Sequence, residues 1–188
     1  MRYRYTFWTA TRATSKSFTA YLGGLIKAVL LPGSTIMIAS DVKGTVIKIA
    51  EAKFAEIFRH WPLLEKELAT RTEDGKTGIK SSGNYYEIRL KNKSVITVVS
   101  KDTSRGLRAT SAILEEAALI EEVAFNEVLW PQMNIARREV DGSLNPEEPS
   151  ASQIFITTAA ERTVFMYQKL IEITVNAVLR PKEYFSWG

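Results

Sequence analysis

One short stretch near the start of the chain constrains the fold more than any other. Residues 5–8 are β-prone, residues 9–15 are small or polar, and an apolar pattern of helical period begins at Phe18. Lys16 and Ser17 stand where the loop meets the helix. This order of strand, loop, Lys-Ser and helix is the layout of a phosphate-binding loop (P-loop, or Walker A motif), in which backbone N–H groups and the helix N-terminus hold phosphate oxygens.

The motif predicts a nucleotide site with defined roles. Lys16 is expected to reach the terminal phosphates of ATP, and the hydroxyl of Ser17 is expected to bind Mg²⁺. The residues that we expect to cradle the nucleotide are Ala10, Thr11, Arg12, Ala13, Thr14, Ser15, Lys16 and Ser17.

The loop departs from the usual G-x-x-x-x-G-K-[ST] pattern at both glycines. Ala10 takes the first glycine's place and Ser15 takes the second's. Glycine is used there because the backbone approaches phosphate closely and can need a positive φ. An alternative interpretation is an ordinary polar helix start, with Ser15 as its N-cap.

Composition excludes several other kinds of chemistry. The 188 residues suffice for one domain with a sizeable core, and no apolar run is long enough to span a bilayer. The start of the chain lacks the apolar region of a signal peptide. There is no cysteine, which excludes disulfides and thiolate metal sites, and the only histidine, His60, is interpreted as structural. The net charge of +4 is compatible with a polyanionic partner without requiring one.

The rest of the chain alternates between strand and helix patterns, which favours an α/β fold. Near-continuous apolar runs predict parallel strands. Residues 85–90 and 94–99 are expected to form a β-hairpin or two adjacent strands at the edge of the sheet, and a helix is expected from about residue 119 to 130. The strands expected to be parallel are residues 5–8, 35–39, 95–99, 111–114 and 153–157.

A second motif lies where one of these strands ends. Ile113 and Leu114 are followed by two adjacent acids, Glu115 and Glu116. In P-loop ATPases an acid pair at this place (Walker B) holds the Mg²⁺ shell and activates the attacking water. The usual pair is Asp-Glu, and the alternative is a solvated helix N-terminus, where acids favour the helix dipole.

The order of these motifs along the chain is that of additional-strand (ASCE-type) P-loop NTPases, with a central, mainly parallel sheet flanked by helices. The carboxyl ends of the parallel strands would gather the site at one edge of the sheet.

Residues 104–116, with the segment Arg105-Gly-Leu-Arg-Ala109 running into the two acids, resemble the large terminase subunit of tailed bacteriophages. Residues 126–131 and 153–159 also fit this family, and the resemblance extends from about residue 7 to residue 171. It implies a DNA-packaging motor ATPase that moves double-stranded DNA through a portal into a procapsid.

The resemblance also implies site roles. Glu115 would be the metal-binding acid and Glu116 the catalytic base, while Arg12 would sense the γ-phosphate and Arg105 would act as an arginine finger in a neighbouring subunit. The segment that reports hydrolysis to moving parts would be Thr157, Thr158 and Ala159. From the residues alone, Arg105 could be a solvated loop charge and Arg12 could pair with a surface acid. Thr157 and Thr158 could be ordinary residues at the end of a strand.

The implied partners are double-stranded DNA, a portal protein, a small terminase subunit and copies of the same chain in a ring, with a monomer possible in isolation. The implied place of work is the host cytoplasm, at the procapsid portal. Residues 1–179 would form the ATPase domain and residues 180–188 the start of a linker to a nuclease domain, so no nuclease activity is expected from this chain. Rival interpretations are a helicase- or translocase-like ATPase outside packaging, and a catalytically weak module that docks on DNA or a portal.

Overall fold

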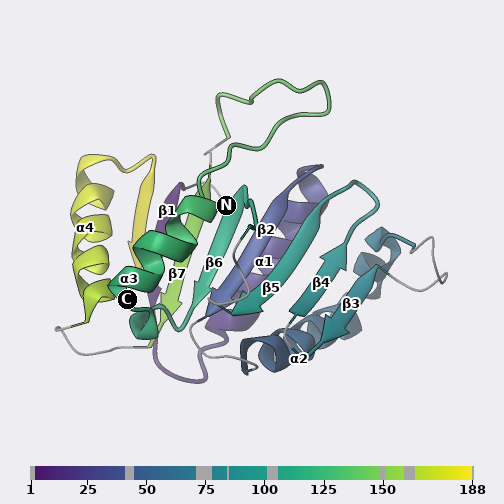
Figure 1. Ribbon diagram of the computed structural model, residues 1–188, viewed down its shortest axis with the longest axis horizontal. Helices are drawn as coiled ribbons and strands as arrows, with labels where there is room; N and C mark the ends of the chain where they lie inside the picture. The colour runs from purple at the N-terminus through teal and green to yellow at the C-terminus, as the bar shows by residue number, and fades with distance from the viewer. Residues whose placement is uncertain are drawn as a thin grey trace.

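The structure is a computed structural model, and it describes residues 3–40, 45–70, 78–83, 85–100, 106–148, 151–158 and 164–187. The strands within these residues form one sheet in the order β3-β4-β5-β2-β6-β7-β1-β8 (Figure 1). Their bounds are β1 Tyr5–Thr9, β2 Thr35–Ser40, β3 Ile79–Ser82, β4 Tyr85–Arg89, β5 Val95–Ser100, β6 Ser111–Glu115, β7 Ser152–Thr157 and β8 Tyr184–Trp187.

The strands predicted to be parallel are confirmed. β1, β2, β6, β7 and β8 run parallel to the strands beside them, and β5 runs parallel to β2. β4 pairs antiparallel with β3 on one side and with β5 on the other, which confirms the hairpin. β7 lies between the strand of the phosphate loop, β1, and the strand that carries the acids, β6. This inserted strand characterises the additional-strand class, so the α/β P-loop NTPase fold is confirmed.

Helices cover both faces of the sheet. The longer ones are α1 (Lys16–Leu30), α2 (Thr45–His60) and α4 (Phe165–Leu179). Short helical turns are α3 (Glu122–Ala124), the 3₁₀ segments Pro62–Glu67, Ala117–Leu119 and Trp130–Gln132, and a π-helical turn at Phe125–Leu129.

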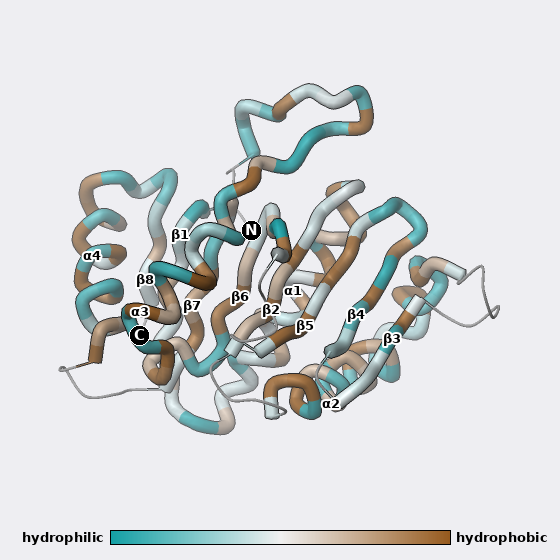
Figure 2. The backbone as a smooth tube through the Cα atoms, in the orientation of Figure 1, coloured by the Kyte–Doolittle hydropathy of each residue, from teal (hydrophilic) through white to brown (hydrophobic). Residues whose placement is uncertain are grey.

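The core has two layers because the strands are buried on both faces. On one side, α1 and α2 pack against residues such as Ile36, Ile38 and Ile113. On the other side, the turns after β6 and α4 pack against Phe7 and Phe155. Hydrophobic stretches accordingly follow the central strands, and the loop that projects beyond the sheet is largely hydrophilic (Figure 2).

Two segments differ from expectation. The helix predicted over residues 119–130 is broken into short turns, although Phe125 and Leu129, four residues apart, still face the core. Residues 184–187 form a strand beside β1, within the segment that the sequence predicts to be the start of a linker. Stacked aromatic pairs hold that strand in place, among them Tyr5 with Tyr184. The boundary at residue 179 and a nuclease domain beyond it stay predictions.

None of the helices in the described ranges combines the length and the apolar character needed to cross a membrane.

Candidate nucleotide site at the carboxyl edge of the sheet

The loop between β1 and α1 contains two residues with left-handed backbone angles. It turns at the carboxyl edge of the sheet and is drawn in purple in Figure 1. Ala13 and Ser15 have positive φ angles of 64° and 56°. A residue with a side chain pays roughly 1–2 kcal/mol in this left-handed region. Ser15 therefore keeps, at some cost, a conformation that glycine at this place would adopt freely.

The alternative of an ordinary helix start is not supported. Ser15 stands at the N-cap position of α1, but its side chain makes no capping hydrogen bond. A capping serine normally has extended backbone angles and accepts a bond from an N–H of the first turn. The loop is better explained by its phosphate-loop geometry than by capping.

Lys16 and Ser17 open α1 at this loop. Lys16 is only 8% exposed, yet its ammonium makes no hydrogen bond or ion pair with a described residue. The hydroxyl of Ser17 donates a hydrogen bond to Oε1 of Glu115. The predicted phosphate-loop serine and the predicted metal-binding acid are thus brought into direct contact, across 98 residues of chain.

Glu115 ends β6 and is almost fully buried, at 3% exposure. Its second oxygen, Oε2, accepts a hydrogen bond from the Tyr21 hydroxyl. Burial raises the pKa of the Glu115 carboxyl above its ordinary value of 4.5, while the two hydroxyls and the charge of Lys16 oppose that rise. Burial and the neighbouring carboxylate also raise the pKa of Tyr21 well above its ordinary value.

The sequence pattern predicts no role in the site for Tyr21. The signal that could have found it is its spacing, because Tyr21 lies four residues after Ser17 and therefore on the same face of α1. A hydroxyl on that face can reach the same carboxylate. Tyr21 fixes the orientation of Glu115 from inside the core.

Glu116, the predicted base, is half-buried and has a φ of 47°. This left-handed residue turns the chain out of the strand and into the 3₁₀ turn Ala117–Leu119. Backbone strain of this kind costs of order 1–3 kcal/mol and is concentrated at functional sites.

Thr157 links the two motifs. Its carbonyl accepts a hydrogen bond from the N–H of Ala10, at 3.2 Å, and its Oγ1 accepts one from the N–H of Ala118, at 3.3 Å. Thr157 therefore touches both the start of the phosphate loop and the turn after the acids. Thr158 follows it and is half-buried.

Those of the remaining predicted site residues that the structure describes make no hydrogen bond or ion pair with Ser17, Glu115 or Thr157. Thr11, Arg12, Ala13 and Thr14 are exposed, and within the loop Thr14 Oγ1 donates to the carbonyl of Thr11 at 2.8 Å. Arg12 makes no ion pair with any residue that the structure describes. Arg105 and Ala159 lie outside the described residues.

The donors at the site suit Mg²⁺. This ion prefers oxygen ligands and is commonly held by one or two carboxylates together with substrate phosphates. Ser17 and Glu115 supply a hydroxyl and a carboxylate side by side. No group of three or more metal-ligating His, Asp or Glu side chains occurs among the described residues, so a cage made only of protein ligands is not what this part of the chain offers.

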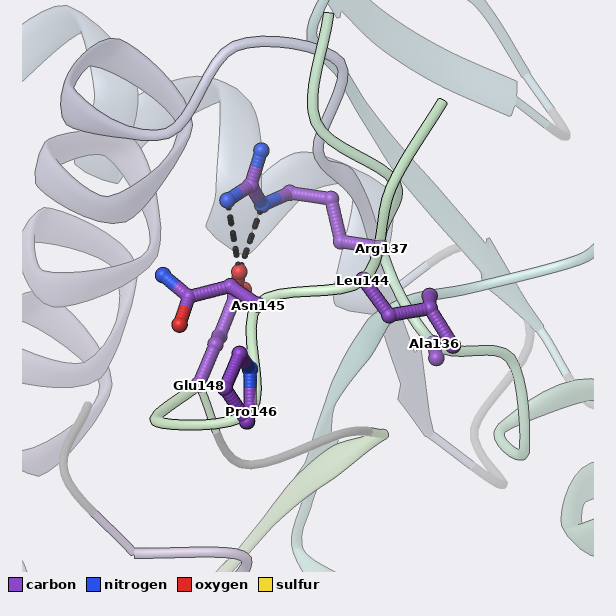
Figure 3. Close-up of a pocket in the computed structure, with 6 residues that line it drawn as sticks. All are labelled: Ala136, Arg137, Leu144, Asn145, Pro146 and Glu148. Atoms are coloured by element: carbon purple, nitrogen blue, oxygen red, sulfur yellow. Dashed lines mark hydrogen bonds and ion pairs between the residues drawn. The ribbon is translucent and has the colours of Figure 1, made fainter. Parts of the chain in front are cut away.

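A cavity of about 240 Å³ lies elsewhere, at the opposite edge of the sheet, beside Arg137 and Glu148 (Figure 3). Arg137 is already engaged, because it donates to Glu148 at 2.7 Å and to the carbonyl of Pro32 at 3.0 Å. This cavity is separate from the phosphate loop.

No protein-family model matches the chain, and no curated protein matches it in sequence. Solved structures do match in fold. The large terminase of bacteriophage HK97 superposes with a TM-score of 0.66 at 13% identity, over 98% of this chain and 35% of that one.

The large terminase of a thermophilic bacteriophage in complex with ADP gives a TM-score of 0.58 at 12% identity, over 98% of this chain and 40% of that one. The large-terminase ATPase domain of Thermus phage P74-26 gives 0.50 at 13% identity, over 98% of this chain and 88% of that one. The chain thus spans little more than a third of the whole terminases and most of the separate ATPase domain. The protein has the P-loop fold of the ATPase domain of phage large terminases.

Proposed function

We propose that this protein binds ATP with Mg²⁺ at the loop between β1 and α1, hydrolyses it, and thereby drives double-stranded DNA into a procapsid. The observation that carries this proposal is the hydrogen bond from Ser17 to Glu115, which places a P-loop hydroxyl against a buried acid at the carboxyl edge of the sheet. The fold of phage large terminases supports it, and the terminase of the thermophilic bacteriophage has been solved with ADP and with ATP-γ-S.

The residues divide the chemistry among them. Lys16 neutralises the terminal phosphates, and its burial without an ionic partner among the described residues leaves its charge available to them. Ser17 and Glu115 hold Mg²⁺, which when bound neutralises charge on the phosphate oxygens. Glu116 takes the proton of the attacking water, a step that typically contributes roughly 10²- to 10⁴-fold in rate.

Two further roles concern motion and assembly. Thr157 contacts both the loop and the turn after the acids, so a shift at either is passed to β7; Thr158 and Ala159 extend this coupling segment. Arg105 supplies positive charge to the ATP of a neighbouring copy. An arginine finger of this type contributes roughly 10³- to 10⁵-fold in rate.

The partners in this proposal are double-stranded DNA, a portal protein, a small terminase subunit and copies of this chain in a ring at the procapsid portal, in the host cytoplasm. A catalytically weak docking module is the second candidate, favoured by the absence of both loop glycines. The left-handed backbone of Ser15 weighs against it.

The test is ATP turnover at increasing protein concentration, with and without double-stranded DNA, for the wild type and Arg105→Ala. A trans arginine predicts that turnover per chain rises with concentration or with DNA in the wild type only. Arg105→Ala should bind ATP as tightly as the wild type. Turnover per chain that is independent of concentration and DNA would contradict the motor, and equal loss of ATP binding would contradict the trans role.

A further inference from the structure

Ser17 and Glu115 mark where the metal and the terminal phosphates would lie in the proposed nucleotide site. The terminal phosphates and the metal must face Ser17 and Glu115, and Glu115 ends β6. The sheet order there is β6-β7-β1-β8. A nucleotide whose base extends away from β6 would pass the end of β1 and reach the carboxyl end of β8.

The carboxyl end of β8 carries an aromatic side chain at that place. Trp187 pairs in register with Trp8, the residue of β1 that comes just before the loop strand ends. Their ring centroids lie 5.4 Å apart with an interplanar angle of 35°. Trp8 is half-buried against the core that α1 covers, so the pair lies on the α1 face of the sheet, beside the phosphate loop.

Trp187 is 58% exposed despite its size. One side of its ring is supported by Trp8, and more than half of the side chain remains open. An indole ring backed by a second indole is a rigid stacking surface, and base–aromatic stacking tolerates any base because every base has a π-face.

We propose that Trp187, supported by Trp8, stacks on the base of the bound nucleotide. The inference rests on the proposed function, since it assigns the base subsite of the same ATP site. It makes Trp187 a binding residue with little power to discriminate between bases, so ATP and GTP should bind with similar affinity.

The experiment compares a ligand that has a base with one that lacks it. Equilibrium binding of ATP and of inorganic tripolyphosphate is measured with Mg²⁺ for the wild type, Lys16→Ala, Trp187→Leu and Trp187→Phe. Leucine keeps apolar bulk in β8 but offers no stacking face. We expect Trp187→Leu to weaken ATP binding about tenfold, with tripolyphosphate binding unchanged and Trp187→Phe close to the wild type.

The matched control is Phe185→Ala. Phe185 lies on the same face of the same strand and is 40% exposed, but it is two residues further from the carboxyl edge. Its loss should leave ATP binding unchanged, whereas equal weakening by Phe185→Ala would show that β8 acts only through its packing and would overturn the inference.

The remaining outcomes separate the two proposals. Tripolyphosphate binding that depends on Lys16, combined with ATP binding that ignores Trp187→Leu, would overturn the base subsite alone. A wild type that binds neither ligand, or binds both independently of Lys16, would overturn the nucleotide site itself and the base subsite with it.

Discussion

The two ends of α1 each bury a lysine, and the two lysines are treated in opposite ways. Lys16 begins the helix at the carboxyl edge of the sheet, and Lys27 follows about three turns later at the amino edge. They are 8% and 4% exposed. Among the described residues, the side chain of Lys27 makes hydrogen bonds and an ion pair, whereas that of Lys16 makes neither and acts on Glu115 only through its charge.

The ammonium of Lys27 donates to Ser111 Oγ at 2.6 Å and to Ser152 Oγ at 2.9 Å, and it lies 3.9 Å from Glu148. Burial lowers the pKa of Lys27, and the carboxylate of Glu148, itself paired with Arg137, opposes that shift. These bonds tie α1 to the first residues of β6 and β7.

The two lysines differ in how their charge is compensated inside the protein, and the nucleotide-binding role of Lys16 stays a prediction. A buried charge is costly unless it is paired and hydrogen-bonded, and Lys27 meets that requirement within the protein. The side chain of Lys16 makes no hydrogen bond or ion pair with a described residue, which is compatible with its predicted role in binding phosphate. Together with the bonds from Ser17 and Tyr21 to Glu115, α1 is fastened to both ends of β6.

Glu116→Gln, at the carboxyl edge of the sheet, should cause the largest change in ATP turnover. It removes the proposed base without changing size, so ATP turnover should fall by roughly 10²- to 10⁴-fold while ATP binding persists. Single-turnover hydrolysis and equilibrium binding measure the two quantities. Unchanged hydrolysis would move the base elsewhere, with Glu115 as the next candidate.

Lys27→Ala probes the amino edge. Removing one member of a buried, bonded charge network should lower the free energy of unfolding by roughly 3 kcal/mol, because Ser111, Ser152 and Glu148 lose a partner. Urea unfolding gives that value. ATP affinity of the folded variant should stay near that of the wild type, and a selective loss of nucleotide binding would break the contrast between the two lysines.

Glu115→Gln should separate function from stability. It keeps the size of the side chain but removes the charge, and its amide offers one acceptor oxygen where Glu115 offers two to Ser17 and Tyr21. Mg²⁺-dependent turnover should fall about 10- to 100-fold. The raised pKa means that the folded state holds the Glu115 proton more tightly than the unfolded chain does. The stabilising contribution of that proton is therefore present below pH 4.5 and is lost as pH rises through the folded pKa.

In Glu115→Gln the free energy of unfolding should not show this decline with rising pH. The amount by which that free energy exceeds the wild-type value should therefore be greatest at neutral pH. Unfolding by urea between about pH 4 and pH 7 measures the difference. A Glu115→Gln protein that is less stable than the wild type at neutral pH would show that the charge of Glu115 is net favourable in the fold.

The smallest effect expected is that of Ser15→Gly. Glycine adopts a positive φ freely, so relief of strain should raise the free energy of unfolding by up to about 1 kcal/mol, reduced by glycine's greater freedom in the unfolded chain. ATP binding should be kept or improved. Thr14→Gly is the control, because Thr14 has no positive φ and its bond to Thr11 would be lost.

The parallel strands and the meeting of the two motifs could be predicted from the sequence. Residues 35–39 and 111–114 are nearly continuous apolar runs, which buried parallel strands require, and Lys16, Ser17 and Glu115 follow positional rules. β8 could not be predicted from the sequence. It is only four residues long, it follows a proline closely, and it becomes a strand only because it pairs with β1.

The partners of Lys27 and Tyr21 escaped prediction for the same physical reason. Lys27 bonds to Ser111 and Ser152, which lie 84 and 125 residues away in the sequence. Tyr21 bonds to Glu115, which lies 94 residues away. No local pattern in α1 distinguishes a lysine with such partners from one without them. The prediction for Lys16 uses only its place after the loop, and its role stays a prediction.

The most direct test of the account is ATP hydrolysis with Mg²⁺ by the wild type, Lys16→Ala and Lys27→Ala, each normalised to folded protein. The wild type should hydrolyse ATP, and Lys27→Ala should do so at a similar rate. Lys16→Ala should lose roughly a hundredfold or more in rate, the loss typical when one electrostatic stabiliser of the transition state is removed. Wild-type turnover in Lys16→Ala would contradict the phosphate-loop assignment and the contrast between the two ends of α1.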